Sequence, residues 1–176
     1  MTEPDATVHV IVITGSMGAG KTTVLGEASD LLAARKVVHA AIDFDALGVA
    51  HLPEGAPDDV RYQNLASVWQ NYATIGVRRL LVAEPLEGRR DVERLQVAIP
   101  GSELVICRLE ASIETMRQRV AVREPGMLQQ QFLARVSSLD AALDAAAVEN
   151  FSIGNDSRSV TDVAREMLAR AGWIDR

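Results

Sequence analysis

The chain has 176 residues, a length that suits one domain and is sufficient to bury a core. Hydrophobic residues make up 48% and charged residues 24%, which is the composition of an ordinary soluble protein. The net charge of −6 argues against a nucleic-acid-binding surface, which is usually basic. Nucleotides stay open as ligands, because a few local cations can hold phosphates within an acidic protein.

In the first half of the chain, apolar runs alternate with helical patterns. A β-branched run over 8–13 predicts a buried strand, and it leads through Gly15 into a helix over 21–34. A second strand is predicted over 37–42. A stretch with Pro and Gly residues then interrupts regular structure before a helix over 58–75.

The second half continues the alternation with a strand over 79–83, a helix over 91–98 and a strand over 104–109. The final predicted elements are a helix over 112–123, a break at 124–126, a helix over 129–148, a strand over 151–153 and a helix that opens with the capping box of Ser159 and Asp162. Five strands alternating with helices require a parallel sheet covered on both faces. The expected fold is one three-layer α/β/α domain over 1–176.

Cellular location is predicted from three features. Cys107 is the single cysteine and cannot form an internal disulfide, which indicates a reducing compartment; within its strand we expect it to be a small buried residue. Met1 to Asp5 is polar and acidic, unlike the basic start of a signal peptide. The apolar run from Val10 to Ile13 is far too short to span a bilayer. We therefore expect a cytoplasmic protein without a membrane partner.

A phosphate-binding motif follows the first strand and opens the first helix. Its glycines allow a tight turn that presents backbone N–H groups to phosphate oxygens, and the helix N-terminus adds partial positive charge. Lys21 is expected to reach the β- and γ-phosphates, and the Thr22 hydroxyl to bind Mg²⁺. The expected nucleotide-binding residues here are Gly15, Ser16, Met17, Gly18, Ala19, Gly20, Lys21, Thr22 and Thr23.

With this motif the sequence resembles the P-loop kinases of the nucleoside monophosphate, shikimate, gluconate and adenylylsulfate kinase group. The resemblance extends over most of the chain, but only the P-loop is highly specific. It implies a sheet in strand order 2-3-1-4-5, ATP with Mg²⁺, and a small phosphoryl acceptor. Asp-Gly-x-Pro-Arg, typical of adenylate kinases after the third strand, is replaced here by Glu84-Pro85-Leu86-Glu87-Gly88, which argues against a nucleoside monophosphate acceptor.

Acidic residues follow the second and third strands, at the sheet edge where open α/β proteins bind ligands. Asp43-Phe44-Asp45 resembles the Asp-x-Asp segment of shikimate kinase-like enzymes. The resemblance implies that Asp43 holds Mg²⁺ or acts on the acceptor hydroxyl, and that Asp45 binds the acceptor. The alternative is that one acid caps the next helix. Glu84 is the third candidate, beside the water shell of the metal, and the alternative is an exposed loop acid.

Arginines after the fourth strand lie where related kinases carry a mobile lid. Arg119 and Arg123 are four residues apart, so they share one helix face, and guanidinium groups suit phosphate charge. We expect both to be catalytic, with a short lid over 119–128, whereas Arg117 points elsewhere. A solvated helix face is the alternative. The lid contains no cysteine cluster, which favours the short-lid type with a small acceptor.

Weaker signals concern the base and the acceptor. Asn155 follows the fifth strand, where related kinases wrap a loop around the adenine, and no guanine-reading signature occurs there. Asn64 and Arg61 lie in the segment expected to form the acceptor pocket. Trp69 and Tyr72 share the apolar helix face and are expected to be core residues more than ligands.

The sequence favours an ATP-dependent small-molecule kinase that moves the γ-phosphoryl group to a hydroxyl or phosphate of an acceptor. A second hypothesis is a nucleotide-binding regulatory or partner-binding module with little or no turnover. A third is a GTP-hydrolysing switch, against which the missing guanine signature argues. The acceptor and the oligomeric state are left open.

Overall fold

The computed structural model describes residues 7–175, so the predicted absence of a signal peptide at Met1 to Asp5 lies outside the described residues. The strands are β1 (Val8–Thr14), β2 (Ala40–Asp43), β3 (Arg79–Ala83), β4 (Ser102–Glu110) and β5 (Phe151–Gly154). The helices are α1 (Lys21–Ala34), η1 (Phe44–Gly48), α2 (Val60–Thr74), α3 (Arg89–Ala98), α4 (Ile113–Arg123), α5 (Gln129–Ala146) and α6 (Val160–Arg170), of which η1 is a 3₁₀ helix.

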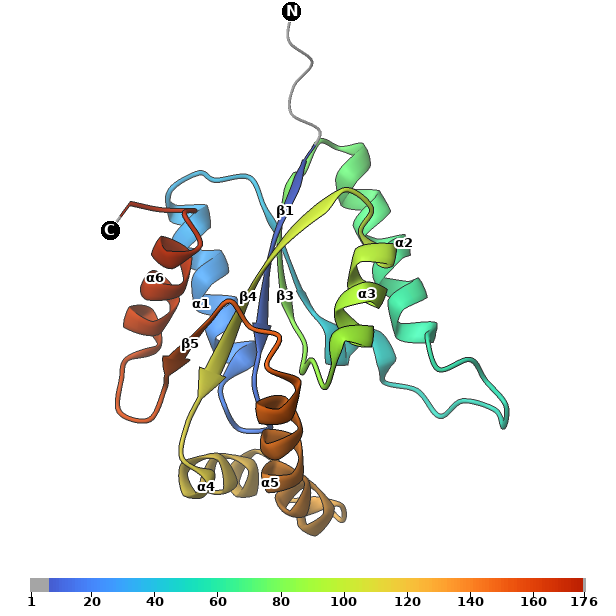
Figure 1. Cartoon of the computed structure of the whole chain (residues 1–176), viewed down its shortest axis with the longest axis vertical. Helices are drawn as coiled ribbons and strands as arrows, with labels where there is room; N and C mark the ends of the chain where they lie inside the picture. Colours follow the sequence, from blue (N-terminus) through green and yellow to red (C-terminus); the bar gives the residue numbers. More distant parts are fainter. Residues whose placement is uncertain (1–6, 176) are drawn as a thin grey trace, which may run out of the picture.

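The strands form one parallel sheet in the order β2-β3-β1-β4-β5, with β1 at its centre. Figure 1 shows α1 and α6 on one face of the sheet and α2 and α3 on the other. The pair α4 and α5 lies below the ends of the strands toward which the arrows point. The predicted strand order and the three-layer α/β/α class are confirmed.

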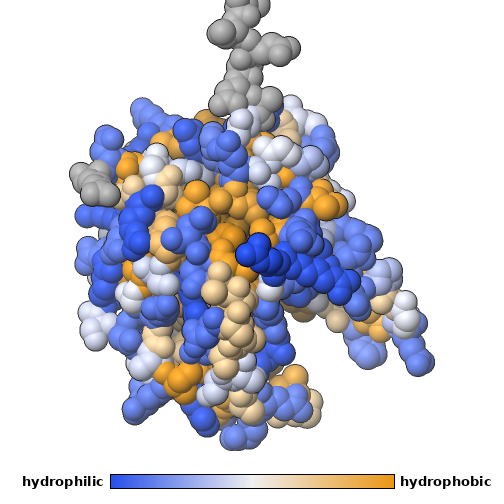
Figure 2. All heavy atoms as spheres, in the orientation of Figure 1, coloured by the Kyte–Doolittle hydropathy of each residue, from blue (hydrophilic) through white to orange (hydrophobic). Residues whose placement is uncertain are grey.

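Alternate residues of β1 pack on opposite faces of the sheet, because successive side chains of a strand point in opposite directions. Ile11 and Ile13 belong to the core beneath α1, α4, α5 and α6, whereas Val10 and Val12 belong to the core beneath α2 and α3. All four side chains are almost fully buried, as the continuous apolar run predicted. Figure 2 shows orange apolar atoms gathered in the middle of one face of the molecule, between blue polar surfaces.

Two predictions about the elements are wrong. The second strand starts at Ala40 and not at residue 37, because the N–H of Val37 bonds back to the Leu32 carbonyl and the chain must first leave α1. Tyr72 is 37% exposed and is not a core residue, since it lies in the last turn of α2, where Ile75 also faces solvent. Trp69 is buried, as predicted.

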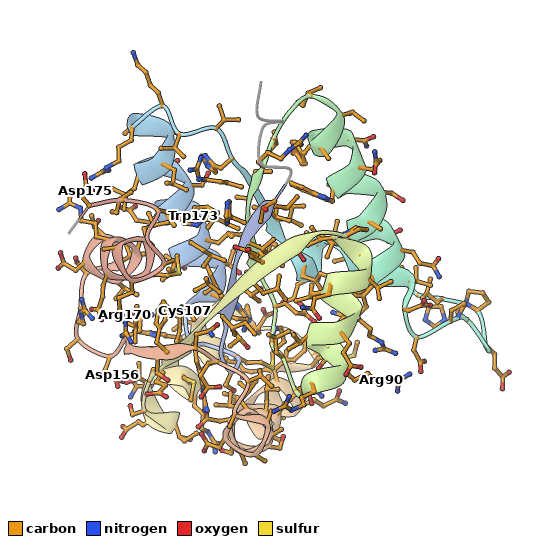
Figure 3. All side chains as sticks on the ribbon, turned by 45° about the horizontal axis from the view of Figure 1, so that its top comes forward. Arg90, Cys107, Asp156, Arg170, Trp173 and Asp175 are labelled. Carbon is orange, nitrogen blue, oxygen red and sulfur yellow. The ribbon has the colours of Figure 1, made fainter. Side chains whose placement is uncertain are left out.

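Smaller features agree with the sequence. The Ser159 hydroxyl accepts the N–H of Asp162 at 3.1 Å, so the predicted capping box opens α6. Cys107 lies within the sheet, fully buried, and burial raises the pKa of its thiol to about 12 (Figure 3). Across the described chain, every helix is too short or too polar to cross a bilayer.

Candidate nucleotide and acceptor site

The P-loop is held in a conformation that only glycine adopts freely. Gly15, Gly18 and Gly20 have φ angles of 148°, 81° and 99°. A side chain would also have no room: a Cβ on Gly15 would lie 2.7 Å from the Leu109 carbonyl oxygen, and one on Gly18 would overlap the backbone of Met116. The loop therefore packs closely against β4 and α4 and ends in the left-handed Gly20, after which α1 begins.

Lys21 and Thr22 lie in the first turn of α1. The Lys21 ammonium group donates to the carbonyl oxygens of Gly15 and Ser16 at 2.9 and 3.1 Å, so it folds back over the loop. The Thr22 hydroxyl donates to Oδ2 of Asp43 at 2.6 Å, which joins the first turn of α1 to the end of β2. The Asp43 Oδ1 accepts the N–H of Asp45 at 3.1 Å, so this carboxylate also caps η1.

Three side chains fix the outer wall of the loop. The buried Ser16 hydroxyl donates to the Val136 carbonyl of α5 at 2.8 Å. The Asn155 amide donates to the Ala19 carbonyl at 2.7 Å. Arg119 donates to the carbonyl oxygens of Gly18 and Asn155 at 3.2 and 2.7 Å. The P-loop is thus tied to α4, to α5 and to the segment after β5.

Figure 3 shows Asp156 beside the start of α4. Its carboxylate accepts the N–H of Ser112 at 2.9 Å, and these hydrogen bonds are the main cause that lowers the pKa of Asp156. The hydroxyl of Ser112 in turn caps α4 by accepting the Thr115 N–H. The loop after β5 therefore holds α4 at two points: Asp156 binds Ser112 at its start, and the Asn155 carbonyl binds Arg119 further along.

The arginines of α4 differ in their surroundings. Arg123 is more than half exposed and pairs with Glu124 at 2.9 Å, and its charge is one cause that lowers the pKa of Lys21. Arg117 is exposed. Residues 124–128 join α4 to α5, and Met127 is 96% exposed there. Arg119 faces the P-loop directly, and Arg123 lies at the end of the same helix.

The remaining P-loop residues differ in exposure. Met17 is half-buried and packs against the core, Ala19 is buried, and Thr23 is exposed on α1.

The residues predicted to bind the acceptor lie beyond the ends of β2 and β3. Arg61 Nη1 lies 3.8 Å from Asp45 Oδ1, and Nη2 lies 4.0 Å from Glu84 Oε1. The Arg61 guanidinium also stacks over the Phe44 ring at 4.9 Å. The Asn64 amide donates to the Leu47 carbonyl at 2.8 Å, which holds α2 against η1. The structure thus brings Asp45, Arg61 and Glu84 together, while Asn64 makes its contact within the scaffold.

Burial dominates the electrostatics of two groups. The side chain of Glu84 is 3% exposed, and burial raises its pKa to about 8, although Arg61 opposes the shift. Burial also lowers the pKa of Lys21, against the raising effects of Asp45 and Glu84. Each group also affects the pKa of the other: Glu84 raises that of Lys21, and Lys21 lowers that of Glu84.

A ready-made metal cluster is absent from residues 7–175: no group of three or more His, Cys, Asp or Glu side chains is arranged to hold an ion. The Thr22 and Asp43 oxygens are adjacent, whereas Glu84 contacts Arg61. This donor set suits Mg²⁺, which commonly takes one or two protein ligands and fills its other positions with water and substrate phosphates.

Several contacts in the site could not be found from the sequence. The carbonyl of Val136 and the backbone of Met116 form the wall of the P-loop, and neither position has a side-chain signal. The Thr14 hydroxyl accepts the N–H of Leu86 at 2.9 Å, which orients the chain after Glu84. The sequence gives no sign that Glu84 is buried, beyond its place at a strand end.

No family model and no curated sequence matches this chain. Solved structures do. A gluconokinase from Sinorhizobium meliloti is 22% identical with a TM-score of 0.61, over 93% of this chain and 91% of that one. A shikimate kinase from Acinetobacter baumannii, solved with shikimate, is 19% identical with a TM-score of 0.59, over 93% and 92%. The chain has the P-loop kinase fold.

A tunicamycin resistance protein from Deinococcus radiodurans has a TM-score of 0.64 at 15% identity, over 95% of this chain and 97% of that one. These identities are low, so the likeness establishes the fold, and the activity of this P-loop protein must be argued from its own residues.

Proposed function

We propose that this protein is an ATP-dependent small-molecule kinase. The observation that carries the proposal is the hydrogen bond from Thr22 to Asp43, 2.6 Å long, beside a P-loop whose three glycines have positive φ. A hydroxyl and a carboxylate at this edge are the oxygen ligands that a nucleotide-bound Mg²⁺ takes from a protein. A loop that only needed to turn would require neither the lysine nor the paired oxygens.

The residues present fit a nucleoside triphosphate. The backbone between Gly15 and Gly20 offers N–H groups to phosphate oxygens, and the start of α1 adds its partial positive charge. Lys21 now donates to two carbonyl oxygens of its own loop and can transfer these bonds to phosphate oxygens. The structural neighbours include an adenylylsulfate kinase solved with an ATP analogue, which supports ATP as the donor.

In the proposed reaction the oxygen of an acceptor hydroxyl forms a bond to the γ-phosphorus, and the bond from that phosphorus to the β–γ bridging oxygen breaks. The hydroxyl proton passes to Asp43, and ADP leaves. Mg²⁺, when bound, neutralises charge on the phosphate oxygens. Lys21 holds the β- and γ-phosphates in place, while Arg123 approaches from the end of α4. Asp45 and Arg61 border the acceptor.

Arg119 has a positioning role in this proposal. Its guanidinium is already bonded to the Gly18 and Asn155 carbonyl oxygens, so it fixes the loop that receives the phosphates. Asn155 acts on the same loop through its contact with Ala19. Small acceptors are supported by the neighbours named gluconokinase, sugar kinase and shikimate kinase. The net charge of −6 supports a small-molecule partner over nucleic acid.

The test is release of ADP from Mg·ATP across a panel of acceptors, with calorimetric titration of a non-hydrolysable ATP analogue in parallel. We expect one acceptor class to raise ADP release, and Lys21→Ala to lower that rate by about 10²-fold or more, because the phosphates lose their principal side-chain cation. Lys36→Ala, at the only other lysine, is the matched control and should act like the unaltered protein.

Acceptor-dependent transfer that survives in Lys21→Ala would contradict the mechanism. A flat panel with tight binding of the ATP analogue would instead favour a nucleotide-dependent binding module. Stronger competition by GTP than by ATP would favour a GTP-hydrolysing switch.

A further inference from the structure

Glu84 is a buried carboxyl group with an unsatisfied oxygen. Its side chain is 3% exposed, and within residues 7–175 its Oε2 atom has no hydrogen-bond partner. Its backbone N–H donates to the Ile13 carbonyl at 3.0 Å, so it lies directly beside the strand that enters the P-loop. Nearly all buried polar atoms in native proteins have a partner, and an exception at a sheet edge calls for a ligand that supplies one.

Arg61 lies beside Glu84, near its other carboxyl oxygen Oε1, without bonding to it firmly. The two contacts that Arg61 makes with Glu84 and Asp45, at 4.0 and 3.8 Å, are longer than hydrogen bonds. The Arg61 side chain is 43% exposed, and its guanidinium stacks on the Phe44 ring. A side chain held in this way can move aside for a ligand with little loss.

A groove on the outer surface reaches Arg61. It has a volume of about 470 Å³ and lies between η1, the loop after it and the start of α2, with Gly48, Arg61 and Asn64 among its lining residues. This volume falls in the range of small-molecule sites. Gly48 leaves room for this position of Arg61, because a Cβ there would overlap the Arg61 side chain.

The charges around Glu84 select the chemistry of the ligand. Asp45 and Asp91 both act on Glu84 as further negative groups, while Arg61 and, more weakly, Lys21 oppose them. Lys21 is committed to the phosphates of ATP in the proposed function. A phosphate or sulfate group would therefore meet three carboxyl groups and one guanidinium that they already share. Hydroxyl and ammonium groups instead bring the hydrogen-bond donors that Oε2 lacks.

We propose that Glu84 reads the phosphoryl acceptor: once Arg61 moves aside, its Oε2 accepts a hydrogen bond from a hydroxyl or ammonium group, which selects polyhydroxylated or amino acceptors over those that carry phosphate or sulfate. This inference rests on the proposed kinase function, since it assigns the acceptor side of the same site. It assigns Mg²⁺ to Thr22 and Asp43 alone and gives Glu84 a role in specificity.

Binding is measured separately from turnover, by calorimetric titration of the full chain saturated with Mg²⁺ and a non-hydrolysable ATP analogue. The probes are gluconate, shikimate, myo-inositol and kanamycin as donor-rich acceptors, with AMP and adenylylsulfate as phosphate- or sulfate-bearing ones. We expect a donor-rich probe to bind at least about 10-fold more tightly than AMP and adenylylsulfate, the two probes that carry phosphate or sulfate. At pH 9, above the pKa of Glu84, Glu84→Gln should weaken that binding by about 10- to 100-fold, the range for a hydrogen bond to a charged group.

Glu103→Gln is the matched control, because Glu103 is an exposed acid in β4 at the opposite end of the sheet. It should bind every probe like the unaltered chain. Gly48→Ala is a second variant that leaves Glu84 in place and forces Arg61 aside. It should tighten binding of the same donor-rich probe, and thermal unfolding reports whether each variant is folded.

The outcomes separate the two proposals. Binding that depends on Glu84 without any ADP release would support this inference and contradict the kinase. Phosphorylation of a probe with unchanged affinity in Glu84→Gln, or a preference for AMP or adenylylsulfate, would support the kinase and overturn this inference. Weaker binding in Gly48→Ala contradicts the proposed movement of Arg61, and absence of binding by all six probes overturns the inference as well.

Discussion

The two halves of the site differ in how completely their polar groups are satisfied. On the nucleotide side, the side chains of Ser16, Asn155 and Arg119 donate to backbone carbonyls at distances from 2.7 to 3.2 Å. On the acceptor side, Arg61 approaches its two carboxyl groups no closer than 3.8 Å, and Glu84 keeps a bare oxygen. The side chains of the first half are hydrogen-bonded without a ligand, whereas the second half keeps a buried oxygen without a partner.

Under the proposed function, this difference follows from what each half would recognise. Phosphates are the same in every nucleotide, so backbone N–H groups on a fixed loop can bind them, and rigidity there favours affinity. Acceptors differ between kinases, so side chains must read them, and these side chains can be satisfied fully only when the acceptor is present. The following predictions test whether the contrast is real, from the largest expected effect to the smallest.

Gly18→Ala should disrupt the complete half most. A Cβ at φ 81° would overlap the Met116 backbone, so we expect the free energy of unfolding to fall by about 3 kcal/mol and nucleotide binding to be lost with it. Urea unfolding measures the change. Gly26→Ala is the matched control: it is exposed within α1 with no atom within 4 Å of the added Cβ, and it should raise stability by about 0.5–1 kcal/mol. Equal effects in both variants would contradict a rigid loop.

Arg119→Ala should loosen the same half without unfolding it. It removes two charge-assisted hydrogen bonds, to Gly18 and Asn155, so the free energy of unfolding should fall by about 2 kcal/mol. Affinity for an ATP analogue should fall by about 10-fold, because the loop loses its fixed position. Arg117→Ala, on the exposed side of the same helix, should change neither quantity. A loss of turnover at full nucleotide affinity would show that Arg119 acts on the transferred group instead.

The incomplete half should depend on pH through Glu84. Burial raises its pKa to about 8 from an ordinary 4.5, so the folded chain retains a proton that the unfolded chain releases between these values. The stabilising effect is complete below the unfolded pKa, and it is lost as pH rises through the folded pKa. Stability should fall with pH by at most about 1.4 kcal/mol per unit.

This slope is measured by urea unfolding at pH 5 and pH 8 without nucleotide or Mg²⁺. The neutral Glu84→Gln side chain should flatten the slope, whereas Glu103→Gln should keep it. Parallel curves for the unaltered chain and Glu84→Gln would mean that Glu84 is ionised in the folded protein, and that Arg61 holds it more firmly than the distance indicates.

Local sequence patterns predicted every strand and helix of the sheet layers, with small errors at their ends. The strand predicted over 37–42 starts too early, at residue 37 instead of Ala40. The N–H of Val37 bonds to the Leu32 carbonyl, and periodicity does not encode this contact. Tyr72 follows the apolar face of its helix but is 37% exposed, because it lies in the last turn of α2, where Ile75 is exposed as well. Periodicity gives the face of a helix, not how far the partner extends.

For the site, the sequence named the residues but not their partners. Lys21, Thr22 and Asp43 were identified by motif and strand-end position, and the structure brings the last two into contact. The bond of Arg119 to Gly18 joins positions 101 residues apart, and that of Ser16 to Val136 joins positions 120 apart. No local pattern reports such pairs, and the role of Arg119 is a prediction that Arg119→Ala tests.

The sequence by itself determined the alternation of strands and helices, the glycine-rich turn and the chemistry of the groups at the strand ends, because periodicity, φ preference and charge are local properties of the chain. Only the tertiary structure decided that Arg119 and Asn155 brace the P-loop, and that Glu84 is buried beside Arg61 with one oxygen that has no hydrogen-bond partner. Burial and hydrogen-bond satisfaction depend on which segments pack together, and that is settled by the whole fold.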